Sequence, residues 1–214
     1  MMASLQIIAH QLGKRYRHSW IFRDFSHEFR APEVYGISGP NGSGKSTLLQ
    51  VLTGFVPPTR GKLKCEDSHA PGIPVELHPR LAYAAPYAEV YEYLTLRELL
   101  GLHLRFRPLY RGLTGEDFLR IAYLEGHEEK LVKTFSSGMK QRLKLALAIL
   151  TQSEALVLDE PVTNLDSTAK EWYRELIREF NMDRLILIAS NETSDFEGAG
   201  TLIHLPDFAP RLTL

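Results

Sequence analysis

The sequence predicts an α/β fold with a mostly parallel sheet, an antiparallel β part at the N-terminus and an inserted all-helical subdomain. Short strands that are apolar throughout alternate with helices, which is typical of a parallel sheet covered on both faces. The N-terminal residues instead alternate between polar and apolar, as half-buried strands do. Between about Leu94 and Leu150 the apolar residues follow helical spacing.

Local patterns place the individual elements along the chain. Alternation predicts strands over residues 4–10 and 20–29, and short apolar runs predict strands over residues 34–37, 62–65, 81–85, 155–158 and 184–189. Helical spacing predicts helices over residues 45–53 and 167–180. Thr95 followed by Glu98 fits a capping box, so we expect the helical block to begin there.

Length and composition indicate the domain organisation and the compartment. The 214 residues suit a single domain, which we divide into a core of residues 1–93 and 151–214 and a helical subdomain of residues 94–150. Cys65 is the only cysteine, so no intrachain disulfide can form and a reducing compartment is expected. The N-terminus lacks the apolar stretch of a signal peptide, and no run approaches the roughly 20 apolar residues that span a bilayer.

The charge of the chain narrows the choice of partners. The formal net charge is −1, whereas proteins that bind nucleic acid usually carry a basic excess. A short basic stretch contains Lys14, Arg15 and Arg17 around Tyr16, which by itself is often a surface aromatic. We therefore expect no nucleic acid partner.

A glycine-rich loop is the strongest motif, and it consists of Gly39, Pro40, Asn41, Gly42, Ser43, Gly44, Lys45 and Ser46. It fills the pattern G-x-x-x-x-G-K-[ST] between a predicted strand and a predicted helix. Glycines let several backbone N–H groups point at one anion, and the helix N-terminus adds partial positive charge. We expect Lys45 to reach the terminal phosphates of ATP, Ser46 to ligate Mg²⁺ and Thr47 to contact phosphate. The motif predicts a P-loop NTPase core.

Two acids follow the apolar strand at 155–158. Carboxylates at the C-terminal end of a buried strand are costly unless they are used, and in a parallel sheet that end faces the ligand crevice. Asp159 is expected to hold Mg²⁺, and Glu160 to polarise an attacking water as general base. A solvated strand end is the alternative, which the upstream phosphate loop makes the weaker interpretation.

A third motif, Phe-Ser-Ser-Gly-Met over residues 135–139, lies between the phosphate loop and the acids. In this order the motifs resemble the nucleotide-binding subunit of ABC (ATP-binding cassette) transporters, whose signature is Leu-Ser-Gly-Gly-Gln. Ser136 and Gly138 match that signature, and the other three positions depart from it. Residues 163–166 resemble the family's D-loop, and Tyr16 stands where the family places an aromatic residue that stacks on adenine.

The resemblance covers about residues 5–205 and implies head-to-tail dimers, in which Ser136 and Gly138 of one chain cap the ATP on the phosphate loop of the other. From the residues alone, Ser136 is an N-cap before a helix whose start is a second anion site. The implied partners are ATP, a second cassette subunit, identical or different, and integral-membrane permease subunits. The permease would dock on an aromatic region that comprises the loop beginning at Pro86 and the helices through about Leu124. The implied location is cytoplasmic, peripheral on the inner face of the cell membrane.

Two positions depart from the family in ways that affect catalysis. Pro86 stands where the family has a glutamine, and proline has no side-chain donor or acceptor. Asn191 stands where the family has a histidine that contacts the γ-phosphate, and an amide cannot carry a proton. With Glu160 retained, these changes lead to the hypothesis that ATP binding is intact and hydrolysis is slow or conditional.

The leading functional hypothesis is the ATP-binding and ATP-hydrolysing subunit of an ABC transporter, which powers transport through separate membrane subunits. The alternative is a non-transport or regulatory ABC ATPase that acts by ATP-driven dimerisation. The replaced glutamine and histidine favour that alternative slightly. The absence of a tandem cassette or a long coiled-coil insertion disfavours a translation or repair factor.

Overall fold

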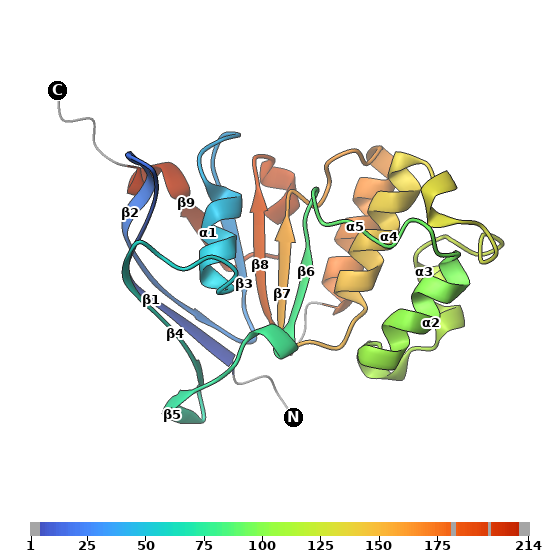
Figure 1. The fold of residues 1–214 in the computed structure, drawn as a ribbon, viewed down its shortest axis with the longest axis horizontal. Coiled ribbons are helices and arrows are strands. Elements are labelled where there is room, and N and C mark those ends of the chain that lie inside the picture. Colours follow the sequence, from blue (N-terminus) through green and yellow to red (C-terminus); the bar gives the residue numbers. More distant parts are fainter. Residues whose placement is uncertain (1–4, 181–182, 197, 210–214) are drawn as a thin grey trace. The chain divides into compact units, whose positions relative to one another are not determined.

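The computed structural model describes residues 5–180, 183–196 and 198–209. Two compact units make up the chain: unit 1 contains residues 1–81, 154–160 and 181–214, and unit 2 contains residues 82–153 and 161–180. Among the described residues, no helix is both long enough and apolar enough to cross a membrane. Figure 1 shows the elements of both units.

Unit 1 contains an antiparallel sheet in the order β2-β1-β4-β5. Its strands are β1 (Leu5–Tyr16), β2 (Ser19–Arg30), β4 (Arg60–Asp67) and β5 (Ala70–Pro74). The sequence predicted β1, β2 and β4 but placed the end of β1 at residue 10, because the pairing shifts register between Ala9 and Leu12 and interrupts the alternation there. It missed β5, a short strand with two prolines and a glycine. Ser4, the first residue predicted for β1, lies outside the described residues.

The second sheet of unit 1 is parallel. It contains β3 (Val34–Ser38), β7 (Ala155–Asp159), β8 (Leu185–Ser190) and β9 (Thr201–His204) in the order β7-β8-β3-β9. Every residue of β7 and β8 is buried, as expected for strands covered on both faces. Helix α1 (Lys45–Leu52) packs on β7 and β8. The predicted α/β fold with its two kinds of sheet is confirmed; β9, whose alternate residues are exposed, was missed.

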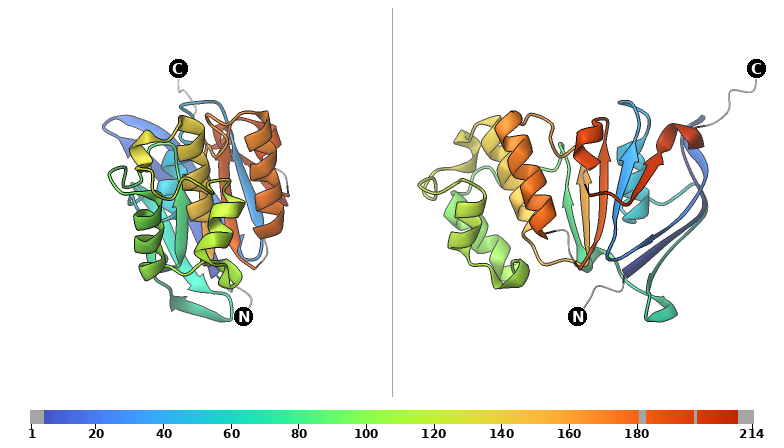
Figure 2. Two further views of the ribbon diagram at one scale, coloured as in Figure 1. Left: turned by 90° about the vertical axis from the view of Figure 1, so that its right-hand side faces the viewer. Right: turned by 180° about the vertical axis from the view of Figure 1, so that it is seen from behind.

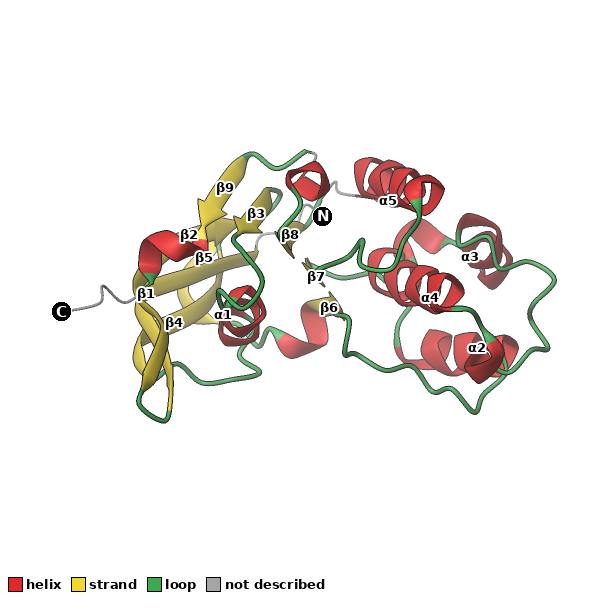
Figure 3. Ribbon diagram, turned by 90° about the horizontal axis from the view of Figure 1, so that it is seen from above, coloured by secondary structure: helices red, strands yellow, loops and turns green. Residues whose placement is uncertain are grey.

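The register of the parallel sheet decides which residues meet at its C-terminal edge. Asp159 pairs with Ala189, and Ser38 pairs with Ser190. The segments that follow β3, β7 and β8 therefore leave the sheet side by side. This edge carries the phosphate loop, the acidic pair and Asn191, and Figure 3 shows the sheet from above.

Unit 2 contains the helices α2 (Leu96–Phe106), α3 (Gly115–Ile121), α4 (Ser137–Ile149) and α5 (Ser167–Phe180). Helices α4 and α5 pack against each other, as Figure 2 shows. The predicted capping box is present: Thr95 Oγ1 accepts from Glu98 N, and Glu98 accepts from Thr95 N. Strand β6 (Leu81–Ala84) begins in unit 1 and continues in unit 2. Short 3₁₀ segments occur in both units, over residues 78–80, 110–112, 132–134, 193–196 and 205–208.

Candidate nucleotide-binding site

The phosphate loop connects β3 to α1 and needs glycine at two of its positions. Gly39 has φ of 154° and Gly44 has φ of 99°. A Cβ atom on Gly44 would lie 2.1 Å from Ile21 Cγ2, and one on Gly39 would lie 2.7 Å from Ser43 Oγ. Both the backbone conformation and the space available therefore exclude larger side chains.

The start of α1 has polar groups that an anion would satisfy. Its N-cap, Gly44, offers no side chain, so the first N–H groups of the helix have no side-chain acceptor. Among the described residues, the buried Ser43 Oγ has no hydrogen-bond partner. A buried hydroxyl and several open N–H groups around one turn fit the oxygens of a phosphate chain. Ser46 and Thr47 in the first turn are half-buried, and Pro40, Asn41 and Gly42 are exposed.

Lys45 lies almost fully buried at the centre of the loop. Its Nζ atom donates to Gly39 O at 2.9 Å and to Pro40 O at 3.2 Å, and it lies 3.0 Å from Glu160 Oε1. Its side chain is 4% exposed and that of Glu160 is 21% exposed. The cation expected to bind phosphate and the carboxylate expected to act as base are thus in direct contact. The sequence did not predict this ion pair, and no spacing in the sequence indicates it.

The acidic pair lies where β7 ends. Asp159 is buried, whereas Glu160 follows it with φ of 47° and donates its N–H to Ala189 O at 2.8 Å. With this left-handed backbone conformation, the Glu160 carboxylate lies beside Lys45. No group of three or more His, Cys, Asp or Glu that could hold a metal occurs in the part of the chain that the structure describes. Mg²⁺ tolerates few protein ligands when phosphate oxygens and waters complete its shell, so Ser46 and Asp159 are a donor set that fits it.

Asn191 follows β8 on the same edge and is exposed. The turn around it is held by its neighbours: Ser190 Oγ accepts from Glu192 N at 3.0 Å and donates to the buried Asp195 carboxylate. In unit 2, Pro86 is also exposed, and its carbonyl accepts from Lys144 Nζ at 3.1 Å. Neither position presents an ionisable side chain.

The signature segment, residues 135–139, lies in unit 2 at the start of α4. Ser136 is the N-cap, and its Oγ accepts from Met139 N at 3.2 Å. Ser136 is exposed, and a Cβ atom on Gly138 would meet no atom within 4 Å, so this helix start is open to an approaching surface. Asp166 of the D-loop segment accepts from Ala169 N at 2.8 Å and caps the first turn of α5.

Two further contacts were not foreseen from the sequence. The buried Gln141 Nε2 donates to Pro161 O at 2.8 Å, so the N-terminal half of α4 is tied to the residue that follows Glu160 in the chain. In unit 1, the ammonium of Lys14 lies 5.0 Å from the ring centroid of Tyr16. The sequence placed Lys14 next to Tyr16 only as part of a basic stretch, although the i, i+2 spacing on a strand puts both side chains on one face.

Comparison with known proteins assigns the family. A family model described as ABC transporter matches residues 22–163, more than half of the chain. The uncharacterized ABC transporter ATP-binding protein YcbN of Bacillus subtilis (strain 168) is 35% identical over 179 residues, which cover 82% of this chain and 58% of YcbN. The bacitracin transport ATP-binding protein BcrA of Bacillus licheniformis is 33% identical over 167 residues, 77% of this chain and 55% of BcrA. The chain thus spans little more than half the length of these relatives.

A solved structure supports the fold independently. The dimeric structure of MJ0796, a bacterial ABC transporter cassette, superposes with a TM-score of 0.76 at 20% identity, covering 93% of this chain and 94% of that one. The phosphate loop on β3 and α1, the acidic pair after β7 and the match of more than half of the sequence agree with one another. The chain therefore belongs to the ABC transporter family and is related to its ATP-binding proteins.

Proposed function

We propose that this chain is the ATP-binding and ATP-hydrolysing subunit of an ABC transporter, which acts through separate membrane subunits. The contact between Lys45 Nζ and Glu160 Oε1, beside the open N–H groups of α1, is the observation that carries the proposal. A phosphate-binding cation, an anion-binding helix start and a candidate general base converge on one edge of the sheet. The names of the relatives favour a transporter over a regulator that acts only by dimerisation.

The residues of unit 1 divide the work of binding and hydrolysis. The N–H groups of residues 42 and 44–46 and the Ser43 hydroxyl would donate to the oxygens of the phosphate chain. Lys45 would exchange its two carbonyl partners and the Glu160 carboxylate for phosphate oxygens. Ser46 and Asp159 would hold Mg²⁺, which neutralises charge on the phosphates when it is bound. Freed from Lys45 by that exchange, Glu160 could orient a water and accept its proton.

Hydrolysis is expected to be slow or conditional. Neither Pro86 nor Asn191 can supply a charged or ionisable group near the γ-phosphate. One missing transition-state donor typically costs roughly a hundredfold in rate. Glu160 is retained and in contact with Lys45, which supports a weakened site over an inactive one.

A second cassette subunit is expected to complete the site. The start of α4 is exposed at Ser136 and open at Gly138, as a surface for the nucleotide of another chain requires. MJ0796, which shares the fold, is a dimer in its solved structure. We propose the same head-to-tail pairing for this chain.

Unit 2 offers a docking surface for a membrane subunit. A pocket of about 290 Å³ is lined by Glu89, Val90, Tyr91, Leu99, Leu102, His103, Phe106, Arg107 and Leu147. Two of these lining residues, Tyr91 and Phe106, are 71% and 77% exposed, which is unusual for large aromatic side chains without a partner. Burial and the nearby Arg107 lower the pKa of His103, so its imidazole is neutral and compatible with an apolar partner.

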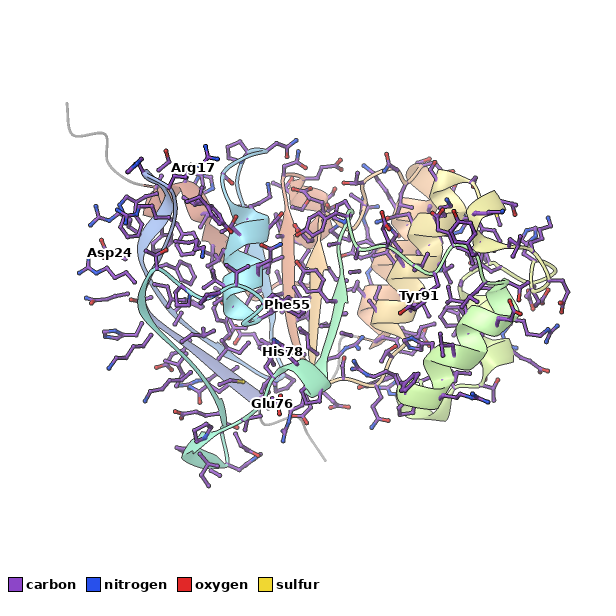
Figure 4. All side chains as sticks on the ribbon, viewed as in Figure 1. Arg17, Asp24, Phe55, Glu76, His78 and Tyr91 are labelled. Carbon is purple, nitrogen blue, oxygen red and sulfur yellow. The ribbon has the colours of Figure 1, made fainter. Side chains whose placement is uncertain are left out.

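Co-purification from membranes tests this proposal. The tagged chain should recover an integral-membrane protein from detergent extracts, and a Tyr91→Ala/Phe106→Ala double variant should lose it. Phe55→Ala is the matched control, because Phe55 is also an exposed aromatic (52%) but belongs to unit 1 (Figure 4). Recovery of no membrane protein by the wild-type chain would contradict the transporter proposal.

A further inference from the structure

Lys14 lies beneath the ring of Tyr16 as a nearly buried cation. The residue is 9% exposed, whereas Tyr16 is 46% exposed. Its Nζ atom donates to Pro57 O at 2.9 Å and lies 5.0 Å from the centroid of the Tyr16 ring. In the described part of the chain, no carboxylate lies within ion-pair distance of this ammonium. A carbonyl and an aromatic face are thus the groups that hold it.

The chain segment after α1 fixes this ammonium in place. Thr59 N donates to Gly13 O at 2.8 Å, and Thr59 Oγ1 accepts from Arg15 N at 3.1 Å. Residues 57–59 are therefore bonded to β1 on both sides of Lys14. Lys14 thus joins β1, which ends at Tyr16, to the chain segment that follows α1.

A cation held on one face of an aromatic ring affects what the other face can do. The attraction between an ammonium and a ring is stronger when the ammonium is desolvated, and it fixes the plane of the ring. It also leaves a single face of Tyr16 for another flat group. A ring fixed in advance loses less freedom when a base stacks on it, which strengthens the stacking.

We propose that Lys14 is a positioning residue for nucleotide binding, which holds Tyr16 as a one-sided platform for the base. The proposal rests on the proposed function, because it requires ATP in the phosphate loop, and on the family resemblance that places the base at Tyr16. Lys14 acts on the base through the ring and makes no contact with the phosphates. Its removal should therefore weaken binding of ligands that carry a base and spare those that do not.

Calorimetric titration of purified variants with ATP and with inorganic tripolyphosphate tests the proposal. Lys14→Met keeps the aliphatic stem and removes the charge, and it should weaken ATP roughly three- to tenfold. Tripolyphosphate affinity should stay unchanged. In a Tyr16→Ala background the same substitution should have no further effect on ATP, because the ring through which it acts is gone.

Two variants control for charge and for folding. Arg17→Gln removes a positive charge from the exposed turn between β1 and β2 (Figure 4) and should leave ATP affinity unchanged. Lys14→Arg keeps a cation over the ring and should bind ATP within about twofold of wild type. If Lys14→Met lowers the melting temperature, the Lys14→Arg variant still tests the proposal.

The outcomes separate this proposal from the proposed function. Equal weakening of ATP and tripolyphosphate would show that Lys14 acts only through long-range charge. Unchanged or tighter ATP binding in Lys14→Met, or a full loss in Lys14→Arg, would also overturn the positioning role. A wild-type chain that binds neither ligand would instead refute ATP binding itself.

Discussion

Helices α1 and α4 both begin at a position that we propose meets an anion, but their first turns are completed in different ways. The N-cap of α1 is Gly44, which gives the helix no side-chain acceptor, and the buried Lys45 lies next to it. The N-cap of α4 is Ser136, whose hydroxyl already accepts from Met139 N, and both Ser136 and Ser137 are exposed. The first N–H groups of α1 therefore lack a side-chain acceptor and are available to an anion. At the start of α4, the Ser136 hydroxyl already accepts from a backbone N–H group. This helix start therefore needs no anion of its own and suits a surface that meets a nucleotide only when another chain approaches.

This contrast supports the proposal that unit 1 binds the nucleotide and that unit 2 completes the site of a second chain. It also explains why the departures from the family signature around Ser136 can be tolerated. A capped, exposed helix start stays folded with varied neighbours, whereas the phosphate loop excludes any side chain at Gly44. Substitutions at the two helix starts should consequently have different effects on ATP binding and on stability.

The largest effect is expected for Glu160→Gln. Loss of the general base should lower ATP turnover roughly a hundredfold to ten-thousandfold while ATP binding persists, measured by phosphate release and by MANT-ATP fluorescence. A nucleotide-dependent dimer should then accumulate in size-exclusion chromatography. Glu76→Gln, an exposed carboxylate of unit 1 (Figure 4), is the control. Unaltered turnover in Glu160→Gln would show that Glu160 is not the general base.

The next effect is expected for Lys45→Met. This substitution removes charge-assisted contacts to phosphate and leaves the Glu160 carboxylate without its cation. ATP affinity should fall roughly ten- to hundredfold, measured by the same MANT-ATP titration. Lys62→Met on the exposed face of β4 is a matched lysine control. A retained affinity would mean that the start of α1 does not bind the phosphates.

Asn191→His should raise turnover, since it returns an ionisable donor to the C-terminal end of β8. We expect a gain of about tenfold, part of the roughly hundredfold that one transition-state donor contributes. Steady-state phosphate release at saturating ATP measures it. Glu192→His, one residue further along the same exposed turn, controls for a histidine in the wrong place. Equal turnover rates in the two variants would show that Asn191 is not a cause of slow hydrolysis.

Ser136→Ala tests the start of α4 directly. Loss of the N-cap should lower the free energy of unfolding by about 1 kcal/mol, measured by urea denaturation. ATP affinity of the isolated chain should not change, because the phosphate loop belongs to unit 1. Ser137→Ala, which alters the next residue without removing the cap, is the control. Weaker ATP binding in the monomer would contradict the division between the two helix starts.

The smallest effect concerns pH and lies in unit 2. The pKa of His103 is lowered mainly by burial, so the unfolded chain binds its proton more readily than the folded chain does. The contribution of His103 to stability is complete above its ordinary pKa of about 6.5 and is lost as the pH falls through that value toward the lower folded pKa. Urea denaturation at pH 7.5 and 5.5 should show a stability loss that His103→Gln reduces. An identical loss in the variant would assign the pH dependence to other groups.

Much of the fold follows from the sequence because its signals are local. The continuously apolar strands β7 and β8, the glycine motif before α1 and the capping box of α2 were each predicted from neighbouring residues. Prediction was poorer where local signals conflict with pairing. The end of β1 lies beyond a register shift at residues 9–12, and β5 contains residues that are typical of turns.

The sequence by itself determined which groups the chain carries: a glycine-rich phosphate-loop motif, two acids at the end of a buried strand, and a proline and an asparagine where the family resemblance implies a glutamine and a histidine. Only the tertiary structure decided which of these groups meet. The contact of Lys45 with Glu160 depends on the order and register of β3, β8 and β7, and the contact of Lys14 with Pro57 depends on the segment after α1 returning to β1. The physical reason is that such contacts join residues far apart in the chain, whose distance is set by sheet pairing and by no local pattern.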